Sequence, residues 1–99
     1  MIYRRQTRSA IYEGTLEEIE DRRGMFLIHI DQGDYVVFEL IQRVRPGLGE
    51  DVAIGNRVSG PLHALGKTEI TNVSGECRLR VYGQTGPSSL TACRRVMFR

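Results

Sequence analysis

The sequence has few of the residues on which metal sites and disulfide frameworks depend. It contains two cysteines, two histidines and no tryptophan in 99 residues. Cys77 and Cys93 are far apart in the chain, and no pair of cysteines or histidines has the close spacing of a structural zinc site. His29 lies in an apolar segment, where a packed or half-exposed histidine is much commoner than a ligand, and His63 lies in a loop. We therefore expect no metal and no cofactor.

The chain also lacks long apolar runs. No stretch approaches the roughly 20 apolar residues that a membrane-spanning helix requires. The basic residues 1–8 are followed by an acidic segment instead of an apolar one, so the sequence predicts no secretory signal. We expect a cytoplasmic protein with no membrane partner, in which Cys77 and Cys93 are reduced and fill small apolar positions.

Motifs for nucleotide binding and catalysis are incomplete. Gly66-Lys67-Thr68 matches the end of a phosphate-binding loop, but the first glycine of that motif would fall at Pro61. The motif must also begin a helix, whereas residues 69–73 have the pattern of a strand. The carboxylates within residues 17–21 form a run that usually solvates a surface. We expect no enzymatic activity and assign no catalytic residues.

Short alternating segments, separated by several of the eleven glycines, predict a mainly β fold. The architecture that fits best is a small closed or partly open Greek-key barrel of OB or SH3-like type, with one short C-terminal helix. We expect residues 1–99 to form a single small domain, with residues 1–8 as a flexible basic arm and residues 42–51 as the longest loop.

The clearest strands are residues 25–30 and 35–41, which form a hairpin around Asp31-Gln32-Gly33-Asp34. Their core-facing side chains are predicted to be Phe26, Ile28, Ile30, Val36, Phe38 and Leu40. Further strands are expected near residues 58–62, 67–73 and 76–82.

Two segments fit both a strand and a helix. Residues 10–20 have apolar residues at helical spacing, but Gly14 favours a strand with a bulge that turns Ile19 inward. After Pro87, Leu90, Cys93 and Met97 have helical spacing, and Ser88 or Ser89 precedes them as a cap. A strand there would turn Arg94 inward, so a helix is favoured.

Charge is unevenly distributed along the chain. Residues 11–39 contain eight acids and two arginines, whereas residues 77–99 contain five arginines and no acid. This asymmetry indicates a basic face and an acidic face, unless the barrel interleaves the segments. Of the 14 basic residues only Lys67 is a lysine. The arginine excess fits phosphate binding, but the codon bias of a GC-rich genome explains it better.

The pattern with most functional content is Cys77-Arg78-Leu79-Arg80-Val81-Tyr82. In a strand, Cys77, Leu79 and Val81 would point inward, and Arg78, Arg80 and Tyr82 would share the outer face about 6.5–7 Å apart. Arginines at that interval suit a phosphate backbone, and a tyrosine offers a stacking surface for a base. We therefore expect weak binding of single-stranded nucleic acid by a non-catalytic module, with Arg94 and Arg95 extending the site. Alternatively, the arginines pair with acids across the sheet.

The competing hypothesis is a protein-interaction or self-assembling module with no role in nucleic-acid binding. Exposed tyrosine and arginine are favoured anchors at protein interfaces, and a basic face can meet an acidic face on a partner or on a second copy. Residues 35–41 would also pair between chains if they formed an edge strand with Tyr35, Val37 and Ile41 pointing outward.

Overall fold

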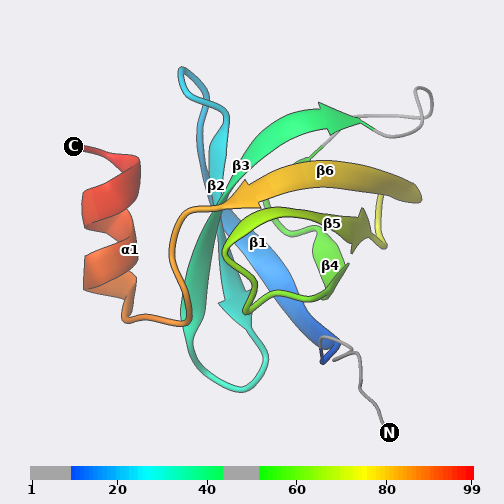
Figure 1. Cartoon of the computed structure of the whole chain (residues 1–99), viewed down its shortest axis with the longest axis horizontal. Coiled ribbons are helices and arrows are strands. Elements are labelled where there is room, and N and C mark those ends of the chain that lie inside the picture. The colour runs from blue at the N-terminus through cyan, green and yellow to red at the C-terminus, as the bar shows by residue number, and fades with distance from the viewer. Residues whose placement is uncertain (1–9, 44–51) are drawn as a thin grey trace, which may run out of the picture.

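The computed structural model describes residues 10–43 and 52–99, which form a closed barrel of six strands and one helix (Figure 1). The predicted basic arm and most of the predicted long loop lie outside the described residues. The elements are β1 (Tyr12–Glu20), β2 (Met25–Ile30), β3 (Tyr35–Arg43), β4 (Arg57–Gly60), β5 (Gly66–Asn72), β6 (Cys77–Gly83) and α1 (Leu90–Met97).

The strand order around the barrel is β1-β2-β3-β6-β5-β4, and every pairing is antiparallel. Strands β1, β2 and β3 follow one another directly, and β4 then returns to lie beside β1, with Tyr12 opposite Gly60. Three consecutive strands with a fourth returning beside the first define a Greek key. The predicted Greek-key barrel is confirmed in its closed form.

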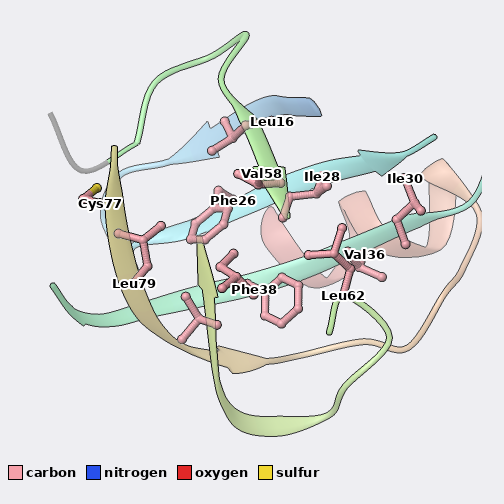
Figure 2. Packing of buried hydrophobic residues seen from close by; sticks show 12 residues of the cluster. Leu16, Phe26, Ile28, Ile30, Val36, Phe38, Val58, Leu62, Cys77 and Leu79 are labelled. Carbon is pink, nitrogen blue, oxygen red and sulfur yellow. The ribbon is translucent and has the colours of Figure 1, made fainter. Parts of the chain in front are cut away.

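The inward side chains of the strands, with Leu62 from the loop after β4, fill the barrel (Figure 2). The predicted core residues of the hairpin are confirmed: Phe26, Ile28, Ile30, Val36 and Phe38 are buried, and Leu40 packs against them. Phe26 and Phe38 face each other across β2 and β3, with ring centroids 6.3 Å apart. This interior holds the outer face of each strand in a fixed orientation.

Residues 12–20 are a strand with a bulge, as predicted. Leu16 pairs with Ile28 but Glu18 pairs with Leu27, so one extra residue is inserted into β1 and Ile19 packs against the core. Gly14 is required by close packing, because a Cβ at this position would lie 2.6 Å from the carbonyl oxygen of His29.

Helix α1 confirms the helical alternative for the C-terminal segment. The Ser89 hydroxyl caps it by accepting a hydrogen bond from the backbone N–H of Ala92 at 3.1 Å. Its buried residues, Cys93 and Met97, form a second apolar cluster with Met25, Leu27 and Val37 on the outer side of β2 and β3. The helix is too short to cross a membrane, and the described part of the chain contains no membrane-spanning helix.

The prediction that residues 35–41 form an edge strand is wrong, and Val37 lies on the predicted outer face but is not exposed. Strand β3 is paired with β2 on one side and β6 on the other. Val37 is fully buried beneath α1, because both faces of β3 carry apolar side chains and the helix covers the second face. Residues 35–39 are therefore hydrogen-bonded on both sides and are not open to pairing between chains.

Arg57 ties three segments of the barrel together at one end. Its guanidinium donates two hydrogen bonds to the carboxylate of Asp31, at 2.8 and 2.6 Å, and others to Thr15 and Glu13 of β1. The hydrogen bond from Arg57 holds the pKa of Asp31 below its ordinary value, and the same contact raises the pKa of Arg57. Arg57 therefore has a structural role, apart from the predicted site.

Candidate nucleic-acid interface

The alternation predicted for β6 is present in full. Cys77, Leu79 and Val81 are buried, whereas the side chains of Arg78 and Arg80 are 65% and 55% exposed and Tyr82 is 42% exposed. Three of the five predicted site residues therefore lie on one strand and point to the same side of it.

Strands β3 and β5 flank β6 and complete a face of the sheet. The register aligns Gln42, Arg80 and Glu69 in one row across β3, β6 and β5, and Glu39, Tyr82 and Lys67 in a second row. Thr71 lies opposite Arg78. We call the outward residues of these three strands the β6 face: Glu39, Ile41, Gln42, Lys67, Glu69, Thr71, Arg78, Arg80 and Tyr82.

Glu69 partly neutralises the two arginines. Its carboxylate lies 3.8 Å from Nη1 of Arg78 and 3.6 Å from Nε of Arg80. Both contacts are exposed ion pairs, which typically contribute about 0–1 kcal/mol, so neither guanidinium is locked. The arginines thus do pair with an acid across the sheet, but the shared partner is Glu69 and not one of the eight acids of residues 11–39 from which the partners were predicted.

The β6 face keeps a small excess of positive charge. Arg78, Arg80 and Lys67 lie beside two acids, Glu39 and Glu69. Glu39 accepts a hydrogen bond from the amide of Gln84 at 2.9 Å. The ion pairs of Arg78 and Arg80 with Glu69 are exposed, so an anion can reach both guanidinium groups without displacing a buried ion pair.

A groove of about 450 Å³ lies on this side of the barrel, lined by Ile41, Gln42, Lys67, Thr68, Glu69, Arg80 and Val81. It lies next to a bulge in β3, where Leu40 pairs with Val81 but Gln42 pairs with Arg80. Ile41 is the extra residue at this bulge, and it is 48% exposed. The groove was not predicted from the sequence, because no residue type in β3 indicates a bulge between Leu40 and Gln42.

The two predicted helix residues lie elsewhere. Arg94 is 3.3 Å from Glu18 of β1, and α1 packs on β2 and β3. Strands β2 and β3 thus separate the Arg94–Glu18 pair from β6 in the sheet order. Arg95 is exposed on the same helix. The structure therefore brings Arg78, Arg80 and Tyr82 together on one face of the sheet and leaves Arg94 away from it.

The histidines pack against aromatic rings. His29 stacks on Tyr35 with centroids 4.3 Å apart and lies 3.3 Å from Glu17, and His63 stacks on Tyr12 at 3.8 Å. Within residues 10–43 and 52–99, no three His, Cys, Asp or Glu side chains gather as a metal site. Gly66-Lys67-Thr68 begins strand β5, which continues to Asn72, so no helix follows it as a phosphate-binding loop would require.

Comparisons of the chain with protein-family models, with curated proteins and with solved structures found no match.

Proposed function

We propose that this protein is a non-catalytic binding module that holds single-stranded nucleic acid weakly across the β6 face. The observation that carries the proposal is that Arg78 and Arg80 project from alternate positions of one strand, with Tyr82 next in line. Lys67 on β5, which lies opposite Tyr82, adds a third cation to the same face. Guanidinium groups two strand rises apart suit successive phosphates, and an exposed tyrosine stacks on any base.

The expected affinity is low for reasons visible on the same face. Glu69 and Glu39 lie among the cations and repel phosphate. Tyr82 is the one aromatic residue among the nine that define the face. Binding should therefore be salt-sensitive and largely independent of sequence.

The test is titration of a fluorescent single-stranded oligonucleotide at low salt, followed by anisotropy. Exchanging both Arg78 and Arg80 for alanine should weaken binding evenly across sequences, because both side chains are assigned to phosphates. Tyr82→Ala should cost about 1 kcal/mol, or roughly fivefold in affinity. Arg22→Ala is the control for Arg78→Ala and Arg80→Ala made singly, since it removes one positive charge from an 85% exposed side chain in the β1–β2 turn.

The predicted extension of the site to the helix has its own test. Arg94→Ala and Arg95→Ala should change affinity much less than Arg80→Ala does, because Arg94 is held beside Glu18 on the far side of β2 and β3. An equal loss at Arg94 would show that the bound strand also crosses α1.

A protein-interaction module is the second candidate, supported by Tyr82 and Ile41 as exposed apolar groups among charges. It predicts no oligonucleotide binding, and either a salt-dependent dimer in light scattering or a protein partner. A cytoplasmic location remains part of the proposal. The buried thiols of Cys77 and Cys93 suit a reducing compartment.

A further inference from the structure

Glu69 contacts both of the arginines to which the proposed function assigns phosphates. Its carboxylate is 3.8 Å from Nη1 of Arg78 and 3.6 Å from Nε of Arg80, and the strand register places Glu69 directly opposite Arg80. In a nucleic-acid strand, one sugar joins each phosphate to the next. A strand whose successive phosphates contact Arg78 and Arg80 therefore brings the sugar between them next to the Glu69 carboxylate.

The Glu69 carboxylate is free to accept a hydrogen bond from that sugar. Its contacts with the two arginines are longer than a hydrogen bond, and 42% of its side chain is exposed, so its lone pairs are accessible. Glu69 and Arg80 also line the groove of about 450 Å³, a volume within the roughly 300–1,000 Å³ of small-molecule sites. A nucleotide can therefore approach the carboxylate from the groove.

The sugar group that suits a carboxylate is the 2′-hydroxyl of ribose. An ionised carboxylate only accepts hydrogen bonds, and a 2′-hydroxyl can donate one. Acidic side chains bind a ribose 2′-hydroxyl in this way in dinucleotide-binding folds. Deoxyribose lacks this hydroxyl, so beside DNA the carboxylate would only repel the phosphates. We propose that the β6 face binds single-stranded RNA in preference to single-stranded DNA, with Glu69 accepting a hydrogen bond from a 2′-hydroxyl.

The preference is for the sugar and not for the base. Every ribonucleotide carries the same 2′-hydroxyl, so a preference for RNA agrees with binding that is largely independent of sequence. The inference rests on the proposed function, because it requires the phosphates to lie on Arg78 and Arg80.

The experiment compares an RNA strand and a DNA strand of the same mixed sequence, with uracil in both so that only the 2′-hydroxyl differs. In anisotropy titrations at low salt, RNA should bind about fivefold tighter, which is the net effect of one hydrogen bond. A third strand carries 2′-fluoro sugars, which keep the sugar conformation of RNA but cannot donate a hydrogen bond. This strand should bind like DNA. If it binds as tightly as RNA, the hydrogen bond to Glu69 is wrong.

Glu69→Ala should bring the ratio of RNA affinity to DNA affinity close to one, because the acceptor is lost. DNA binding itself should strengthen, since a carboxylate that repels phosphate is removed. Glu17→Ala is the control, because it removes one negative charge from a side chain that is 40% exposed, against 42% for Glu69, on the distant strand β1. The control should keep the wild-type ratio. An equal fall of the ratio in both variants would overturn the role assigned to Glu69.

The outcomes separate the inference from the proposed function. If DNA binds the wild-type protein at least as tightly as RNA, and both lose affinity when Arg78 and Arg80 are exchanged for alanine, the preference for RNA is wrong and the proposed function stands. If neither strand binds at low salt, both are wrong. The comparison of the three strands uses the wild-type protein, so its result does not depend on whether Glu69→Ala folds.

Discussion

The salt dependence of binding gives the sharpest test of the β6 face, and its size follows from the number of cations. Each phosphate neutralised on a single strand contributes about 0.7 to the slope of log affinity against log salt. Arg78, Arg80 and Lys67 offer three such contacts, so the expected slope is about −2. Raising salt from about 50 to 200 mM should then weaken binding roughly 20-fold.

Exchanging Arg78 and Arg80 for alanine leaves Lys67 as the cation on this face. The slope should fall to about −0.7, and the same increase in salt should weaken binding less than about threefold. The ion pairs with Glu69 change this little, because exposed pairs of this kind are broken at a cost of about 0–1 kcal/mol. Anisotropy titrations at several KCl concentrations, with an oligonucleotide of mixed sequence, measure both slopes.

Arg22→Ala should keep the wild-type slope, because the β1–β2 turn is not part of the β6 face. A wild-type slope near zero, or a double variant that keeps the full slope, would contradict this prediction. In either case the cations of β6 do not contact phosphate.

Three further predictions concern the frame that presents the face. The contact with Arg57 lowers the pKa of Asp31, so this ion pair stabilises the folded protein above about pH 4 and stops doing so as pH falls through the lowered pKa. In urea denaturation at a series of pH values, Asp31→Asn should therefore make the free energy of unfolding fall less steeply with decreasing pH than it does in the wild-type protein. Met97→Ala should destabilise the protein by about 2–5 kcal/mol in urea denaturation and expose the buried Cys93 thiol to a thiol reagent, since both side chains anchor α1. Gly83→Ala should lower stability in thermal denaturation by about 1–3 kcal/mol, because its methyl would overlap a backbone carbonyl oxygen of the β4–β5 loop.

The sequence predicted the parts of this fold that alternation controls. The buried and exposed sides of β6 follow from a two-residue period that runs from the buried Cys77 to the exposed Tyr82. The bulge in β1 was predicted because Ile19 is out of phase with Leu16, and burying both requires an extra residue. The helix was predicted because Cys93 and Met97 fit a helical period and a strand would turn Arg94 inward.

The rest could not be predicted, because it depends on which elements meet. Alternation assigned Val37 to an outer face but gave no information on what covers that face, and α1 covers it. The bulge at Ile41 depends on how β3 pairs with β6 over its last residues, and the groove depends on the bulge. Glu69 lies eleven residues from Arg80 in the chain and becomes its neighbour through the register of β5 with β6.

Because the described strands join into a ring, the main chain of β6 is paired with β3 on one side and with β5 on the other. A ligand that lies over β6 must consequently be recognised by side chains. Outward positions such as Arg78, Arg80 and Tyr82 can be randomised as a library for selection, while Leu79 and Val81 on the same strand preserve the scaffold. The barrel is thus a natural framework on which new binding specificities can be evolved.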